Sequence, residues 1–240
     1  MSTSTSPSSQ QAQLVVPPPR QMTARQIARR EQILAVTLRM IADQGYQAVT
    51  MDALATASGV SKKTLYDIYG SKDSLLAAAV SGRMTMIVAN IERGARARGL
   101  ELLFSIIRMT IAAVLEQPRL SRALEPILLL DPGRFTIREF FDRLHRPCLA
   151  QMAEDELLAD WANVDFLVSN LMIEQIAVQN FWAVDVIGTE QLEGFALLSV
   201  CRVLLPVAKG HAHAELVTKI KQLHSQLGDW EYGKRHGGTV

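Results

Sequence analysis

Hydrophobic residues recur at spacings of three and four along nearly the whole chain from Thr23 onward. This period is typical of helices that bury one face, and the sequence shows no sustained alternation of the kind that marks a half-buried strand. Capping hydroxyls and glycines, such as Thr50, Ser61, Gly45 and Gly59, divide the pattern into segments. The sequence therefore predicts an all-α protein, with helices over residues 23–44, 51–57, 62–69, 72–93, 99–116, 119–130, 135–157, 163–185, 189–208 and 212–227.

The two ends of the chain lack this pattern. Residues 1–22 are rich in Ser, Thr, Gln and Pro and offer little to bury, so we expect a disordered tail there and a frayed tail over 231–240. Between the tails, the short helices at the front and the long helices behind them suggest two domains. We expect a small N-terminal domain over 23–80 and a larger helical domain over 81–230.

Charge is distributed unevenly, although the net charge is only +1. Residues 1–90 carry nine Lys or Arg against five Asp or Glu, and the remaining 150 residues carry 16 basic and 19 acidic side chains. A hydrophobic content of 48% with 20% charged residues is typical of a globular, soluble chain. Only the basic N-terminal part of the chain is therefore expected to bind phosphate groups.

Several classes of chemistry are missing from the sequence. Cys148 and Cys201 have neither disulfide nor metal spacing, and His211 with His213 lacks a third ligand, so we expect no bound metal. No phosphate-binding glycine loop, nucleophile elbow or cofactor motif is present, so we expect no cofactor and no enzyme activity. The N-terminus lacks a secretory pattern and polar residues interrupt the most apolar stretches, which predicts a cytoplasmic protein without a membrane partner.

The most informative segment is Thr50–Leu75, with the sequence TMDALATASGVSKKTLYDIYGSKDSL. Two short helices joined by a tight turn at Gly59 have the spacing of a helix-turn-helix. Leu54, Ala55, Val60, Leu65 and Tyr69 fall on one face and would lock the helices together. The outer face of the second helix would then carry lysines, hydroxyls and Tyr66, which suit contacts with a DNA groove.

This segment strongly resembles the DNA-binding domain of the TetR family. The resemblance covers about residues 24–80 and includes Gly45, Thr50, Leu54-Ala55, Gly59-Val60-Ser61, Thr64-Leu65-Tyr66, Tyr69 and Ser71-Lys72-Asp73-Ser74-Leu75. It implies that the recognition helix contacts bases and backbone through Lys62, Lys63, Thr64 and Tyr66. It further implies that Thr50, Ser61, Tyr69 and Lys72 hold phosphates or cap helices, although Tyr69 could be pure core. Asp67 departs from the usual pattern; it could read a cytosine amino group or simply point along the groove.

The same resemblance implies a C-terminal domain that binds a small-molecule effector and forms a homodimer through its last long helices. Residues 163–185 show two separate apolar faces and 189–208 are apolar nearly all round, so we expect these two helices to form the dimer seam. Candidates for the lining of an effector pocket are Phe104, Met109, Phe140, Phe141, Phe166, Asn170 and Glu174. Asn170 and Glu174 could equally form polar contacts at the seam or face solvent.

The sequence therefore predicts a sequence-specific regulator of transcription that binds double-stranded operator DNA. We expect a repressor that a small, largely apolar effector releases from its operator. One alternative is a ligand-independent DNA-binding factor of the same fold, which the absence of a sizeable apolar cavity would favour. The other is an all-helical enzyme or interaction module that begins with a helical hairpin.

Overall fold

The computed structural model describes residues 22–94, 96–130 and 135–228, so the tails expected over 1–22 and 231–240 lie, apart from Met22, outside the described residues. The described residues form ten helices and no strand, which confirms the all-α prediction. The helices are α1 (Ala24–Gln44), α2 (Met51–Ser58), α3 (Lys62–Tyr69), α4 (Lys72–Gly94), α5 (Gly99–Glu116), α6 (Pro118–Leu130), α7 (Ile137–Glu154), α8 (Val164–Ala183), α9 (Leu192–Leu204) and α10 (Gly210–Leu227).

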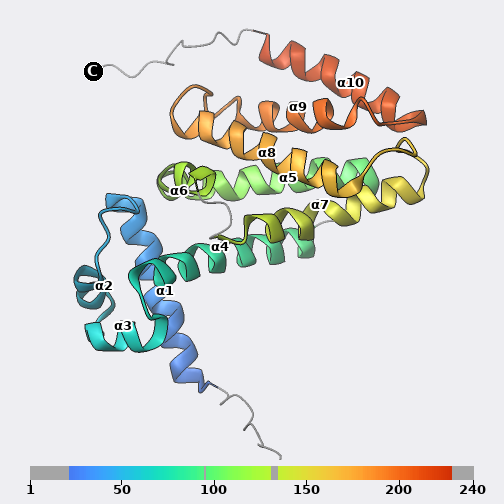
Figure 1. Ribbon diagram of the computed structural model, residues 1–240. Coiled ribbons are helices and arrows are strands. Elements are labelled where there is room, and N and C mark those ends of the chain that lie inside the picture. Colours follow the sequence, from blue (N-terminus) through green and yellow to red (C-terminus); the bar gives the residue numbers. More distant parts are fainter. Residues whose placement is uncertain (1–21, 95, 131–134, 229–240) are drawn as a thin grey trace, which may run out of the picture.

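Helices α1, α2 and α3 form a small unit at one end of the molecule, and α5–α10 stack into a larger body at the other (Figure 1). Helix α4 runs from the small unit into the larger body, and α1 packs against both α4 and α6. Within the body α8 contacts α6, α7 and α9, and α10 covers α9. The molecule is therefore a three-helix head joined to a helical bundle through one continuous helix.

Most predicted helix ends agree with the structure to within two or three residues, and the largest difference is at α9. The sequence predicts a helix over 189–208, whereas α9 ends at Leu204. The chain after it pairs with the segment that follows α7: the Ala159 N–H donates to the Val207 carbonyl at 2.7 Å. The Lys209 N–H donates to the Leu157 carbonyl, also at 2.7 Å. These tertiary bonds satisfy backbone groups that a longer helix would otherwise have paired internally.

Helix α4 is long and apolar enough to cross a membrane, judged by length and composition alone. In the structure one face of the helix is packed: Leu75, Leu76, Ala79 and Val80 are buried. The helix joins the head and the body, because it packs on α1 and α3 as well as on α5 and α7.

Candidate nucleic-acid interface and interior cavity

Side-chain caps define where the two short helices of the head begin. The Thr50 hydroxyl accepts a hydrogen bond from the Ala53 N–H at 3.2 Å, and the Ser61 hydroxyl accepts one from the Thr64 N–H at 3.1 Å. Gly59 ends α2 with a φ of 65°, in the left-handed region that favours glycine. The turn between α2 and α3 is therefore fixed by local chemistry at the positions that the sequence predicts.

The inner face of α3 is anchored in the core of the head. Leu54 and Leu65 have no exposed surface, and Val60 packs against the same cluster. Because α3 makes only two turns, this anchoring determines which residues point outward. Tyr66 is 45% exposed, and Lys62 and Lys63 lie beside it on the outer surface. The helix thus presents two cations and a phenol to solvent on a braced support.

Each of these lysines is held by an acidic side chain. The Lys62 ammonium lies 2.9 Å from the Asp52 carboxylate of α2, and the hydrogen bond to Asp52 raises the pKa of Lys62. Lys63 lies 2.7 Å from Asp67, one turn along α3. All four side chains are well exposed, so solvent and salt weaken both pairs. DNA phosphates can therefore compete with the two carboxylates for the lysines.

The structure also locates the remaining predicted contacts of the head. Thr50 and Ser61 cap helices through their hydroxyls, and Lys72 at the start of α4 donates to the Gln47 carbonyl at 3.4 Å. Tyr69 differs from its expected phosphate contact: its hydroxyl is buried, and no hydrogen-bond partner for it is found among the described residues. Burial raises the pKa of this phenol. Tyr69 therefore lies with the core of the head, which was the alternative that the sequence left open.

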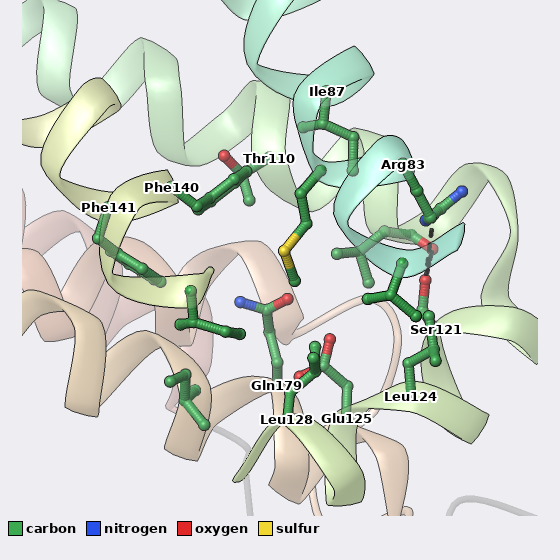
Figure 2. A pocket seen from close by; sticks show the side chains of 15 residues that line it. Arg83, Ile87, Thr110, Ser121, Leu124, Glu125, Leu128, Phe140, Phe141 and Gln179 are labelled. Carbon is green, nitrogen blue, oxygen red and sulfur yellow. Dashed lines mark hydrogen bonds between the residues drawn. The ribbon is translucent and has the colours of Figure 1, made fainter. Parts of the chain in front are cut away.

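A cavity of about 80 Å³ lies inside the body, between α4, α5, α6, α7 and α8 (Figure 2). Two of the predicted effector-site residues, Phe140 and Phe141, are part of its wall. The other lining residues come from helices that the sequence could not place together: Val80, Arg83, Met84, Ile87, Thr110, Val114, Ser121, Leu124, Glu125, Leu128, Ile137, Ile176 and Gln179.

The structure places the other five predicted pocket residues elsewhere. Phe104 is core at 2% exposure, and Met109 lines a separate surface groove between α4 and α5. Phe166 is 66% exposed, and Asn170 and Glu174 lie on the same outer side of α8. The reason is the phase of α8, which turns Ile176 and Gln179 toward the cavity and its other apolar face outward.

Exposed apolar side chains follow that outer face of α8 as far as the residue that ends the helix, with Asn170 and Glu174 between them. We define the α8 stripe as Phe166, Ile173, Phe181 and Val184, each between 47% and 66% exposed. Along its edge the Arg202 guanidinium of α9 lies 2.7 Å from the Glu174 carboxylate. A row of exposed apolar side chains along one helix is a feature of surfaces that bind another protein.

Polar groups of the cavity wall carry an unusual electrostatic arrangement. Burial raises the pKa of the Glu125 carboxyl to about 8, and the opposing attraction of Arg83 is weaker. Arg83 donates from Nη2 to the Ala113 carbonyl at 3.1 Å and to the Ser121 hydroxyl at 3.5 Å. The Thr110 hydroxyl is buried and lacks a partner among the described residues. No group of side chains that could hold a metal is found in the described ranges.

A capped, braced helix-turn-helix with an exposed cationic second helix is the architecture of a DNA-binding head. Residues 33–79 match the family model described as bacterial regulatory proteins, tetR family.

Curated relatives agree with the family match. The regulator YvaF of Bacillus subtilis (strain 168) is 50% identical over 50 residues, which cover 21% of this chain and 26% of YvaF. The repressor KstR of Mycolicibacterium smegmatis is 39% identical over 71 residues, covering 30% of this chain and 35% of KstR. The matches thus span about a quarter to a third of these relatives.

Solved structures extend the likeness to the rest of the fold. A TetR transcription regulator from Haloarcula marismortui superimposes with a TM-score of 0.62 at 20% identity, covering 76% of this chain and 100% of that one. A putative TetR-family regulator from Mesorhizobium loti gives 0.58 at 21% identity, covering 78% and 100%. The larger helical body therefore has the TetR fold as well, while its sequence differs widely.

Proposed function

We propose that this protein is a dimeric regulator of transcription that binds operator DNA through α3 of each protomer. The observation that carries the proposal is the geometry of α3: Leu65 is fully buried while Lys62 and Tyr66 face outward from a rigid support. Lysines can bind phosphates or guanine edges, and tyrosine can bind phosphates. We assign base and backbone contacts to Lys62, Lys63, Thr64 and Tyr66, in the cytoplasm where such a regulator would meet chromosomal DNA.

A second protomer is needed because one two-turn helix buries too little surface for a specific complex. The α8 stripe supports a two-fold interface, since an exposed apolar face on a helix of 20 residues can pack against its own copy. The predicted seam of helices near 163–185 and 189–208 corresponds to α8 and α9. Glu174 and Arg202 would form the polar edge of that seam rather than part of a ligand site.

Effector control would act through α4. Helix α4 begins directly after the recognition helix, and its residues Val80, Arg83, Met84 and Ile87 line the interior cavity. The predicted domain boundary at residue 80 falls within this helix, so a change in the cavity can shift the head without a flexible joint. We propose that a small effector in the cavity favours a dimer geometry that no longer fits the operator, which makes the protein a repressor.

The sign of regulation rests on analogy and needs its own test. Among the relatives, KstR is named a repressor and FasR of Mycolicibacterium smegmatis an activator, so the family likeness supports either. A reporter driven by a promoter that contains the selected operator would separate them. Expression that falls when the protein is present supports repression, and expression that rises contradicts it.

DNA binding is tested by selecting bound duplexes from random DNA and measuring affinity for the enriched site. Lys62→Ala and Tyr66→Ala should each weaken binding by about 1–3 kcal/mol, with the fold unchanged by circular dichroism. Lys221→Ala, which removes an exposed lysine from α10, is the matched control and should have no effect. Failure to enrich a palindromic site, or equal affinities for all four proteins, would contradict the proposal.

One observation favours a second candidate, a ligand-independent DNA-binding factor of the same fold. The cavity of about 80 Å³ is well below the ~300–1,000 Å³ of sites that enclose drug-sized ligands. A protein of this kind would bind its operator with the same affinity in the presence of every candidate effector. The two functions are therefore separated by titrating small molecules against the protein–operator complex.

A further inference from the structure

We propose that the interior cavity binds a compact, uncharged, largely apolar molecule that carries one hydrogen-bonding oxygen, such as a short-chain alcohol or ketone, and that Thr110 anchors this oxygen. The inference deepens the effector part of the proposed function and rests on it. It concerns the chemical class of the ligand, which the family likeness leaves open.

The wall of the cavity is mostly apolar. Ten of the fifteen lining side chains are apolar, and they surround the space from all five helices: Val80, Met84, Ile87, Val114, Leu124, Leu128, Ile137, Phe140, Phe141 and Ile176. Nearly the whole surface of an apolar ligand would therefore contact apolar side chains. The volume of about 80 Å³ restricts the ligand to a few carbon atoms unless flexible side chains such as Met84 move.

The wall also contains a polar group without a hydrogen-bond partner among the described residues. The Thr110 hydroxyl lies on α5, its residue is 9% exposed, and its oxygen has no hydrogen-bond partner among the described residues. A buried hydroxyl without a hydrogen-bond partner destabilises the folded protein. A ligand that hydrogen-bonds to it removes this penalty, which adds to the free energy of binding. Figure 2 shows the Gln179 amide reaching into the same space from α8, within the same wall.

The charges around the cavity favour an uncharged ligand. A ligand anion or cation would lose its hydration inside this apolar space, and Thr110 and Gln179 carry no charge to compensate it. Arg83 already donates to Ala113 and Ser121 and also lines the groove outside the cavity, so its charge is partly directed away. Because burial keeps the Glu125 carboxyl protonated at neutral pH, with its pKa near 8, Glu125 offers a hydrogen-bond donor rather than a negative charge.

The experiment compares matched ligands on the full-length protein. Butan-1-ol, hexan-1-ol and decan-1-ol are titrated beside hexanoate and hexylamine, which keep the six-carbon chain but carry a charge at pH 7. Binding is measured by ligand-observed NMR and by the midpoint of thermal unfolding. We expect butanol and hexanol to bind, decanol to bind more weakly than hexanol, and both ions to bind at least about tenfold more weakly than hexanol.

A variant pair tests the anchor. Thr110→Val removes the unpartnered hydroxyl and should weaken hexanol binding by about 2- to 10-fold without lowering the stability of the free protein. Thr85→Val, at an exposed threonine of α4 outside the cavity, is the matched control. The proposal is overturned if either ion binds as tightly as hexanol, if decanol binds more tightly than hexanol, if Thr110→Val leaves the affinity unchanged, or if no alcohol binds.

The same preparations are assayed for operator binding, so that the two proposals fail separately. Full DNA affinity without binding of any alcohol overturns the ligand class alone. Alcohol binding without DNA affinity overturns the regulator and leaves the ligand class standing. Alcohol binding that leaves the DNA affinity unchanged supports the ligand class and contradicts effector release.

Discussion

Glu125 makes the stability of this protein depend on pH in a direction opposite to that of a usual carboxyl. Burial raises the pKa of its side chain from 4.5 to about 8 in the folded chain. Between these two values the folded state holds a proton that the unfolded state has released. The contribution of Glu125 to the free energy of unfolding is therefore fully present below about pH 4.5. It is lost as the pH rises toward 8.

The substitution Glu125→Gln removes this dependence while keeping the size and shape of the side chain. Each unit of pH between the two pKa values changes the free energy of unfolding by about 1.4 kcal/mol. The stability of Glu125→Gln relative to the wild type should thus increase by about 3 kcal/mol between pH 5.5 and 7.5. Thr110 and Gln179 remain in place, so the cavity itself changes little.

Urea unfolding at a fixed protein concentration measures this difference at several pH values. Glu116→Gln is the matched control, because Glu116 acts electrostatically on the same Arg83 but lies exposed on α5. The control should differ from the wild type by less than about 1 kcal/mol at every pH. A stability difference for Glu125→Gln that stays flat from pH 5.5 to 7.5 would refute the reasoning, because it would mean that Glu125 is ionised in the folded protein.

Three further predictions address other parts of the molecule. Burial lowers the pKa of His145 from 6.5 to about 4, so the folded protein loses stability as the pH falls below 6.5. The free energy of unfolding of His145→Phe relative to the wild type should therefore rise by about 2 kcal/mol between pH 7 and pH 5. A difference in urea unfolding that stays constant over this range contradicts the prediction. Ile173→Glu, in the middle of the α8 stripe, should be monomeric by light scattering, because the interface would bury a charge. Met86→Glu, at a similarly exposed site on α4, should remain dimeric. If both variants are dimers, α8 does not form the dimer interface. Asp67→Asn should strengthen binding to random DNA and steepen its salt dependence, because it releases Lys63, and an unaltered salt slope would show that the pair does not restrain the lysine.

The helices themselves could be predicted from the sequence because their signals are local. The apolar period, the capping hydroxyls and Gly59 act over at most a few residues, and nine of the ten helices end within about three residues of the predicted positions. The position of α3 follows from the sequence for the same reason. Its caps at Ser61 and Gly70 and its buried Leu65 are all within one short segment.

The pairing of charges on the head required the tertiary structure. Lys62 and Asp52 are ten residues apart and belong to different helices, so only the angle between α2 and α3 brings them to 2.9 Å. The sequence suggested a free cationic surface, whereas both lysines are already engaged with carboxylates. Lys63 and Asp67 have the spacing of a helical ion pair, which is a signal that could have been used.

By itself, the sequence determined that this chain is helical and that α3 is an exposed, capped helix of the TetR type. Only the tertiary structure decided which face of α8 turns inward, and with it the cavity wall, since both faces of that helix are apolar and its period is compatible with either phase. The same holds for Thr110, Glu125 and Gln179, which come from three helices. Their meeting depends on packing between distant segments, and local patterns carry no information about that packing.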